Sequence, residues 1–230
     1  MRDIDDLLID LREKSIKYLG FDLTECEQGS KDWHTARLGV ITASRAEDVY
    51  KKLKNGKYAA GRETYMLQLI AEILTGESKS ISAKSLEWGT ENEHAARLEH
   101  GDSQEIPFIY TDDMRCGYSP DGLTDTGLVE IKCPHASENH LKTVFDGFIK
   151  PEYIAQMQFG MWVSGRDYCD FVSYDPRIIR TTNLCTIRVE KDNEIQDLLS
   201  EEVPKFINEM DALLDKLGVK FGDQWSKDNG

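Results

Sequence analysis

The order of helix and strand patterns along the chain predicts an α/β fold, with a central mixed β-sheet flanked by helices. Three observations support this prediction. Apolar residues recur at helical spacing through the first hundred residues, three short segments rich in β-formers follow, and helical and strand patterns then alternate. The 230 residues, 40% hydrophobic and 30% charged, are expected to form a single globular domain over 1–230.

The N-terminal half is expected to consist of helices, because its apolar residues recur every three or four positions. The first of these helices belongs to a helical extension over residues 1–22, and its outer face is acidic. Thr42 or Ser44 is expected to cap the third helix. The other predicted helices each end close to a glycine, and they lie at about 30–38, 62–75 and 84–99.

Strand patterns begin after residue 104. EIPFIY, RCGYS and LVEIKC are short, rich in β-formers and separated by DD and PDG turns, so they predict a β-meander. Helices and strands are then expected to alternate, with helices at 137–146 and 152–164, strands at YCDFVSY and LCTIRVE, and a C-terminal helix and tail over 190–225.

The composition argues against several classes of protein. The chain has no apolar run of the roughly 18 residues that a membrane span needs, and its start lacks the apolar centre of a signal peptide. Its five cysteines are odd in number and form no CxxC pair. We therefore expect reduced thiols in a cytoplasmic protein, with neither zinc nor an iron–sulfur cluster.

The net charge of −14 argues against a protein that coats nucleic acid non-specifically, because phosphate repels such a surface. It leaves room for an enzyme that acts on nucleic acid, since acidic metal ligands add to the negative charge. One segment is basic: KKLKNGKYAAGR, residues 51–62, has five basic residues and no acid. It is either a solvated loop between helices or a strip that contacts DNA.

The segment SPDGLTDTGLVEIKCPH, residues 119–135, contains the clearest candidate for a catalytic site. Glu130 and Lys132 share one face of a strand, and the preceding turn can bring Asp121 close to Glu130. Two adjacent carboxylates favour a bound cation, and oxygen ligands, with the carbonyl of Ile131 among them, suit Mg²⁺ or Mn²⁺. Lys132 could then position or activate a water for phosphodiester hydrolysis. The alternative is an ordinary Glu-x-Lys pair on the wet face of a strand.

Two neighbouring helices supply further candidates. Glu93 lies on the last helix before the strands, where it could be another metal ligand, and Glu91 and Glu87 are rival choices on nearby faces. The segment YIAQMQFGMW places Gln156 and Gln158 in an otherwise apolar helix. A glutamine there needs a partner, which is either the attacking water or a core backbone group.

Seven segments, in order, resemble the viral alkaline-exonuclease family of lambda-exonuclease-like enzymes. They extend from about residue 24 to 225 and are DWHTARLGVITAS, LEWGTENEHAAR, SPDGL, LVEIKCP, YIAQMQFGMWV, SYDPR and FGDQW. The resemblance implies a PD-(D/E)xK restriction-endonuclease-like core. It also implies a Mg²⁺-dependent 5′-to-3′ exonuclease on double-stranded DNA ends, with two ions per active site and Mn²⁺ as a substitute. Such an enzyme releases 5′-mononucleotides and leaves 3′ overhangs for phage recombination by single-strand annealing.

The resemblance also assigns roles to residues. It places catalysis on Asp121, Glu130 and Lys132, puts Glu93 near the second metal ion, and matches Gln158 to the glutamine of the family. For the DNA end it implies a pocket for the 5′-phosphate and an apolar wedge. The pocket residues are Arg37, Thr42, Ser44 and Ser119, and the wedge is Leu86.

The family is further expected to form a homotrimeric ring around duplex DNA with a 5′-phosphorylated end. Its expected partner is a phage single-strand annealing protein in the cytoplasm of a bacterial host, with no membrane involved. Two other functions stay open at this point. One is a sequence- or structure-specific endonuclease on the same core, and the other is a non-catalytic protein that binds DNA ends in recombination.

Overall fold

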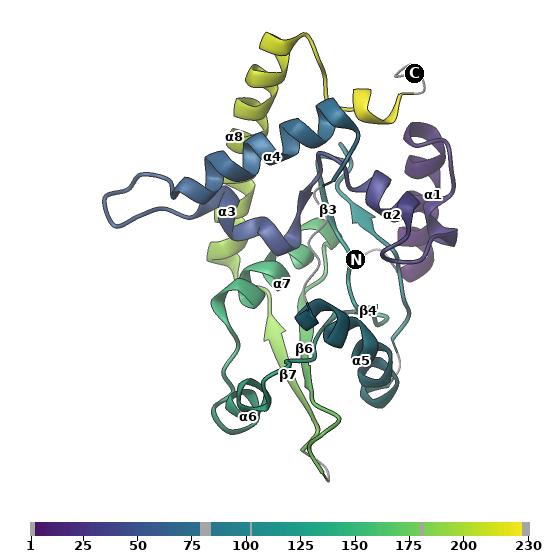
Figure 1. The fold of residues 1–230 in the computed structure, drawn as a ribbon, viewed down its shortest axis with the longest axis vertical. Coiled ribbons are helices and arrows are strands. Elements are labelled where there is room, and N and C mark those ends of the chain that lie inside the picture. The colour runs from purple at the N-terminus through teal and green to yellow at the C-terminus, as the bar shows by residue number, and fades with distance from the viewer. Residues whose placement is uncertain (1–2, 79–83, 102, 180–181, 227–230) are drawn as a thin grey trace.

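The strands of the chain form two small mixed sheets that lie among the helices in this computed structural model (Figure 1). The structure describes residues 3–78, 84–101, 103–179 and 182–226. The mixed α/β class predicted from the sequence is confirmed, although two sheets take the place of one central sheet. Within the described residues, no helix is both long and apolar enough to cross a membrane.

The first sheet has the strand order β1-β3-β2. Strand β3 (Cys116–Tyr118) pairs in parallel with β1 (Ile41–Thr42) and antiparallel with β2 (Ile109–Tyr110). Strand β1 was not expected from the sequence, because two residues are too few to show an alternating pattern. Its register places Thr42 opposite Gly117.

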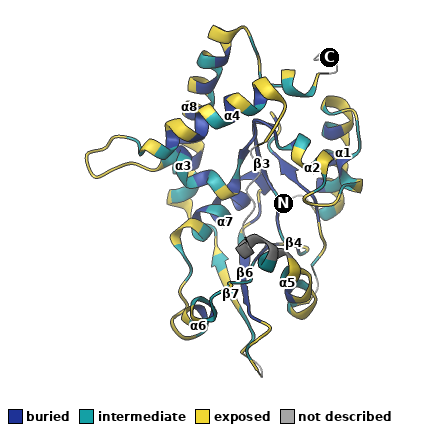
Figure 2. Ribbon diagram, in the orientation of Figure 1, coloured by how far each residue is buried: buried dark blue, intermediate teal, exposed yellow. Residues whose placement is uncertain are grey.

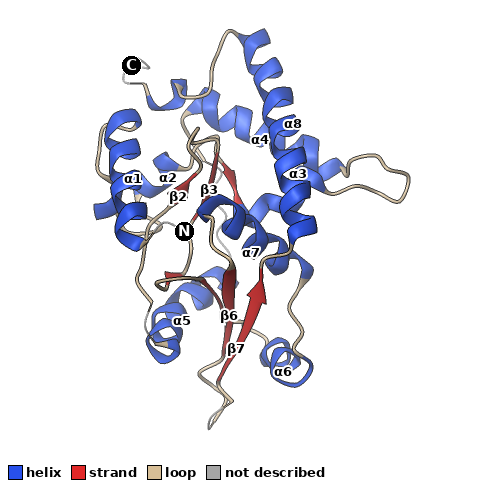
Figure 3. Cartoon of the chain, turned by 180° about the vertical axis from the view of Figure 1, so that it is seen from behind, coloured by secondary structure: helices blue, strands red, loops and turns tan. Residues whose placement is uncertain are grey.

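The second sheet has the order β4-β5-β6-β7 and contains the Glu-x-Lys strand. Its strands are β4 (Gly122–Leu123), β5 (Leu128–Lys132), β6 (Tyr168–Tyr174) and β7 (Leu184–Glu190). Strand β5 pairs antiparallel with β4 and parallel with β6. Strand β6 pairs antiparallel with β7, and these two lie side by side in Figure 3. The predicted meander therefore breaks between β3 and β4. Pro120 lies at the break and lacks the N–H that a continuous ladder needs.

Helices cover both sheets, and most were expected near their observed bounds. They are α1 (Ile4–Tyr18), α2 (Lys31–Ala36), α3 (Ala46–Tyr50), α4 (Ala60–Thr75), α5 (Lys84–His100), α6 (Ser137–Asp146), α7 (Pro151–Ser164) and α8 (Asn193–Leu217), with short 3₁₀ turns η1 (Leu23–Glu25), η2 (Ala43–Arg45) and η3 (Asp223–Trp225). The third predicted helix is shorter than expected. Thr42 precedes it without a side-chain cap, and the chain becomes extended at Lys51.

Helix α7 lies at the centre of the molecule and positions the site (Figures 1 and 2). Met157, Phe159 and Met161 are all buried, so the helix is covered on most of its circumference. Gly160 allows close packing against β3, because a Cβ atom there would meet the ring of Tyr118 at 2.7 Å. The polar residues of α7 must therefore find partners inside the fold.

Candidate active site

Glu130 is fully buried in β5, and both of its carboxylate oxygens accept hydrogen bonds. Gln156 of α7 donates to Oε1 at 2.6 Å, and the Lys132 ammonium contacts the same oxygen. The hydroxyl of Tyr118, from β3, donates to Oε2 at 2.8 Å. Burial raises the pKa of Tyr118 well above its usual value, and the nearby Glu130 charge adds to that effect. The carboxylate is thus fixed where β3, β5 and α7 meet.

Asp121 lies in the turn before β4, and its carboxylate faces the neighbouring strand. The N–H of Ile131 donates to its Oδ2 at 2.6 Å. The N–H and C=O of one strand residue point to the same side, so the carbonyl of Ile131 also points toward this edge. Burial raises the pKa of Asp121 well above its ordinary value, and the charge of Glu130 raises it further. The structure therefore brings together three of the four predicted metal ligands, the carboxylates of Asp121 and Glu130 and the carbonyl of Ile131.

Lys132 supplies the positive charge of this cluster. Its side chain is 27% exposed and lies over the ring of Tyr153, with Nζ 5.1 Å from the ring centre. Burial alone would lower the pKa of Lys132, but the charges of Glu130 and Asp121 raise it above its usual value. Lys132 therefore stays protonated and offsets part of the repulsion between the two carboxylates.

The donors around Asp121 and Glu130 fit a hard divalent ion such as Mg²⁺ or Mn²⁺, because all of them are oxygens. Among the residues that the structure describes, no group of three or more His, Cys, Asp or Glu side chains could hold a metal ion. The side chains thus offer part of a coordination sphere. A carbonyl oxygen and water would have to complete it, which suits Mg²⁺ because this ion usually keeps several waters.

Glu93 reaches the same cleft from α5. Arg97 donates to its Oε1 at 2.7 Å and also donates to the backbone oxygen of Asp121 at 2.6 Å. Burial raises the pKa of Glu93, Arg97 and Lys132 lower it, and the Glu130 charge raises it. The rival Glu91 is exposed, and the side chain of Glu87 lies outside the described residues. Arg97 is a residue of the site that the sequence analysis missed, although its i+4 spacing from Glu93 is a signal for the pair.

The position of Gln158 corrects an expectation. Its Nε2 donates to the backbone oxygen of Glu190 at 2.8 Å, and its Oε1 accepts from the N–H of Asp192 at 3.0 Å. Gln158 thus joins α7 to the start of α8 and does not reach Glu130. Residues two apart on a helix point in nearly opposite directions, so only one of the two glutamines can face the site. That residue is Gln156.

A cleft of about 630 Å³ opens beside these groups. Glu93 and Asp121 line one part of it, and Lys132, Lys150 and Tyr153 line another. The cleft is large enough for part of a nucleotide chain, and both acidic and basic side chains line it. The carboxylates can hold a cation, and the lysines can attract phosphate.

A second constellation surrounds Arg37, at the end of α2. Its Nη1 donates to the hydroxyl of Ser119 at 2.9 Å, and its guanidinium lies 4.0 Å from the ring centre of Trp33. Burial lowers the pKa of Arg37 to about 10. Within the described part of the chain, Arg37 forms no ion pair, so its charge is available to an anionic ligand.

The other residues expected at the DNA end are not in direct contact with the Arg37–Ser119 pair among the described contacts. Thr42 uses its N–H to donate to the hydroxyl of Tyr65 at 2.9 Å, and Ser44 is exposed in η2. The described contacts join neither residue to Arg37 or Ser119, although Thr42 lies opposite Gly117, two residues before Ser119. Leu86 belongs to α5, and its side chain lies outside the described residues.

Comparison with known proteins decides the family. Residues 32–167, more than half of the chain, match the YqaJ-like viral recombinase domain. The chain belongs to this family. A segment of 77 residues, 34% of the chain, is 40% identical to ExoD of Escherichia coli (strain K12) and covers 87% of that protein.

Solved structures agree with the family. The alkaline exonuclease LHK-Exo of Laribacter hongkongensis is 39% identical, with a TM-score of 0.74 over 82% of this chain and 96% of that one. The same enzyme in complex with dAMP gives a TM-score of 0.69 over 82% and 98% of the two chains. A phage-related exonuclease of Haemophilus somnus 129PT, 18% identical over 77% and 96%, has a TM-score of 0.59 and shows the shared fold. The YqaJ-like recombinase described here is therefore a nuclease with the predicted PD-(D/E)xK type of fold.

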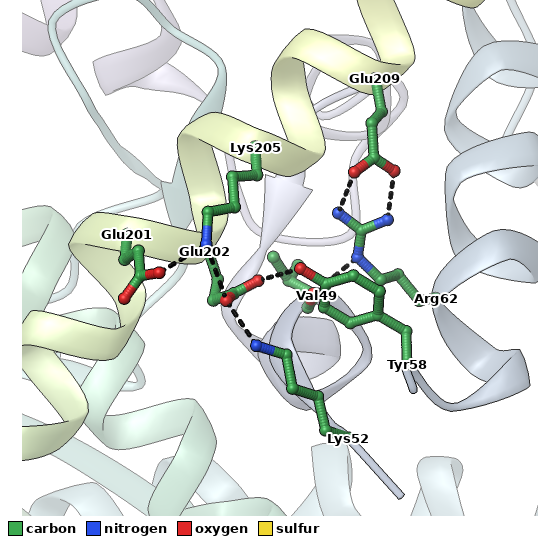
Figure 4. Close-up of polar contacts among 8 residues, drawn as sticks. All are labelled: Val49, Lys52, Tyr58, Arg62, Glu201, Glu202, Lys205 and Glu209. Atoms are coloured by element: carbon green, nitrogen blue, oxygen red, sulfur yellow. Dashed lines mark hydrogen bonds and ion pairs between the residues drawn. The ribbon is translucent and has the colours of Figure 1, made fainter. Parts of the chain in front are cut away.

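The basic segment of this recombinase forms a hairpin that projects from the body (Figure 1), closed by a bridge between Lys52 and Tyr58. Figure 4 shows how α8 holds its base. Glu202, with a side chain only 1% exposed, accepts from Lys52 at 2.8 Å and from Tyr58 at 2.5 Å. At the exposed tip, Lys54 and Lys57 have no ion pair among the described residues.

Further along the segment, Arg62 donates to both carboxylate oxygens of Glu209, at 2.5 and 3.1 Å. Lys51 pairs with Glu47 at 2.9 Å. Three of the five basic side chains of the segment thus attach it to the body. They are Lys51, Lys52 and Arg62. The net positive charge that faces solvent is concentrated at the tip of the hairpin.

Proposed function

We propose that this recombinase is a Mg²⁺-dependent exonuclease that degrades one strand of duplex DNA from its 5′ end. It releases 5′-mononucleotides and leaves 3′ overhangs for recombination by single-strand annealing. The observation that carries the proposal is the spacing of the two constellations. Ser119, which binds Arg37, is two residues from Asp121, so their Cα atoms are at most about 7 Å apart.

This spacing supports removal of one nucleotide at a time. A terminal phosphate at Arg37 and Ser119 would place the following phosphodiester beside Asp121 and Glu130. Arg37 suits that task, because it is charged, stacked on Trp33 and without an ion pair among the described residues. An end without a phosphate would lose this anchor. The 39% identical LHK-Exo binds dAMP, a mononucleotide of the class proposed here as product.

The residues of the catalytic cleft suggest the division of labour. Asp121, Glu130 and the carbonyl of Ile131 would hold a Mg²⁺ or Mn²⁺ ion, with Glu93 beside a second one. When bound, the metal acts as a Lewis acid and makes a coordinated water more acidic. Gln156 keeps Glu130 in place through Oε1.

Lys132 and Gln156 both donate to Oε1 of Glu130. If a metal ion bound this oxygen, the ammonium of Lys132 could turn away from it and toward the substrate. There it would stabilise negative charge on the phosphate that is being hydrolysed. We also propose a homotrimeric ring in the bacterial cytoplasm, which passes its product to an annealing protein. The likeness to the alkaline exonucleases over most of the chain supports the exonuclease activity, and sedimentation of the protein would test the trimer.

A nuclease assay with defined ends tests the proposal. Blunt linear duplexes with either a 5′-phosphate or a 5′-hydroxyl are incubated with the protein, with and without Mg²⁺. We expect metal-dependent release of mononucleotides, faster from the phosphorylated end. Digestion from the 3′ end, or cleavage of closed circular DNA at a similar rate, would contradict the proposal and favour an endonuclease.

A further inference from the structure

The C-terminal segment FGDQW, residues 221–225, contacts the turn that carries Arg37. This segment contains η3 and lies close to α2 and α4, far from both in sequence (Figure 1). Trp225 donates its indole N–H to the backbone oxygen of Thr35 at 2.9 Å. Gln224 donates from Nε2 to the backbone oxygen of Leu38 at 3.0 Å. The two carbonyls lie on either side of Arg37 in the chain.

These bonds act where the chain leaves α2, of which Arg37 is the C-cap residue. The oxygen of Thr35 also accepts from the N–H of Leu38 at 3.3 Å, so Trp225 adds a second donor there, and Gln224 binds the oxygen of Leu38 just beyond the helix. The segment 221–225 supplies donors to two carbonyls at this end. It thereby fixes the direction in which the backbone leaves α2, and with it the direction of the Arg37 side chain.

The segment is itself held in a defined conformation. Oε1 of Gln224 accepts from the N–H of Gly222 at 2.8 Å, so the amide that reaches Leu38 cannot turn freely. The ring of Phe221 lies 4.3 Å from the guanidinium carbon of Arg115, and the backbone oxygen of Arg115 accepts from the N–H of Ile41 at 2.9 Å. The segment therefore contacts the α2 end of the turn directly, and it reaches the β1 end only through Arg115.

Contacts with α4 further restrict the turn. Gly39 has a φ of +69°, and a Cβ atom there would lie 2.5 Å from the side chain of Ile73. Glu72 of α4 accepts from the N–H of Gly39 at 3.0 Å. Both α4 and the C-terminal segment thus hold the turn, and loss of either contact would let Arg37 shift.

We infer that the C-terminal segment 221–225 positions Arg37 and so sets the preference of the enzyme for 5′-phosphorylated ends. This inference rests on the proposed function of the Arg37 pocket. The segment has no described contact with Asp121, Glu130 or Lys132, so it acts on end recognition and leaves the hydrolytic step unchanged.

Two independent variants test the inference. Trp225→Phe removes the indole N–H and keeps an aromatic ring beside Phe221, and Gln224→Met removes the amide and keeps the chain length. Trp162→Phe is the matched control, because it removes an indole N–H that donates to Ser200 at 3.0 Å, away from Arg37. For each protein, kcat/KM is measured on 5′-phosphate and 5′-hydroxyl duplexes, together with the melting temperature.

We expect each tail variant to lower the ratio of the two kcat/KM values about fivefold, the equivalent of one net hydrogen bond. The rate on the 5′-hydroxyl duplex should stay as in the unmodified protein, and Trp162→Phe should keep the full ratio. An unchanged ratio in both tail variants would overturn the inference, whether the two rates are unaltered or fall by the same factor. If the unmodified protein digests both ends equally, the phosphate pocket itself is wrong, and the role of the segment falls with it.

Discussion

Gln156 donates to Glu130 at 2.6 Å, whereas Gln158, two residues further along α7 and on the opposite face of the helix, binds the backbone at Glu190 and Asp192. The two glutamines of one short motif thus have separate tasks. Gln156 holds the carboxylate of Glu130, which we propose to be catalytic, and Gln158 joins α7 to the connection between β7 and α8.

This division predicts opposite effects of two similar substitutions. Gln156→Leu should lower kcat about tenfold or more, because Glu130 loses a donor that orients it, with little change in stability. Gln158→Leu should lower the free energy of unfolding by about 1–3 kcal/mol, because buried backbone groups lose their partners, and kcat should change little. Steady-state kinetics and urea denaturation of both variants distinguish the two roles. Equal effects on kcat would contradict the assignment.

Substitution of Arg37 should affect the choice of end. Arg37→Lys keeps the charge but loses the planar stacking on Trp33 and the ability to bind phosphate through two nitrogens. We expect the preference for 5′-phosphate over 5′-hydroxyl ends to fall about tenfold, which is the loss of one charged hydrogen bond. Competition between the two duplexes in one reaction measures the ratio directly. A preserved preference would place the terminal phosphate elsewhere.

The stabilising effect of Glu202 at the base of the basic hairpin should be lost at low pH. Burial alone would raise the pKa of Glu202, but hydrogen bonds from Lys52, Tyr58 and Lys205 lower it to about 2. The folded pKa lies below the unfolded value of about 4.3, so Glu202 stabilises the fold above that pH and loses this effect as the pH falls toward 2.

Glu202→Gln should therefore cost at most about 3 kcal/mol near pH 7, and the cost should shrink as the pH falls below about 4. Glu201→Gln is the control, since Glu201 is 64% exposed and pairs with Lys205 on the same helix. Urea denaturation at pH 7 and pH 3.5 compares the variants. A cost for Glu202→Gln that is equal at both pH values would show that its charge is not responsible.

The tip of the hairpin should contribute to duplex binding through charge. Replacement of Lys54 and Lys57 by alanine should weaken binding to all sequences and lower the slope of log K against log salt by about two. Lys51→Ala is the comparison, because Lys51 is already paired with Glu47. Affinity for a short duplex, measured over a series of salt concentrations, gives the slope. An unchanged slope would support the alternative of a solvated loop.

The elements with strong local patterns could be predicted from the sequence. Strands β6 and β7 match YCDFVSY and LCTIRVE residue for residue, since both are rich in β-formers and follow turn residues. The candidate metal-binding hairpin could be recognised because its residues are close in sequence. Asp121, Glu130 and Lys132 are all within one short stretch, and pairing of β4 with β5 brings them together.

The features that were missed depend on contacts between distant segments. The choice between Gln156 and Gln158 depends on which face of α7 meets β5, and both faces of that helix are apolar. The division into two sheets depends on how β1 pairs with β3, across more than seventy residues. The roles of Arg97 and of the C-terminal segment likewise arise from tertiary packing, which no local pattern encodes.

A crystal of the protein soaked in Mn²⁺ tests the central claim most directly, because the anomalous signal of manganese locates the ion without any assay of activity. We expect a peak within coordination distance of Asp121, Glu130 and the carbonyl of Ile131, absent from the Asp121→Ala variant. A map with no manganese at these oxygens, while Lys132 keeps its contact with Glu130, would contradict the account.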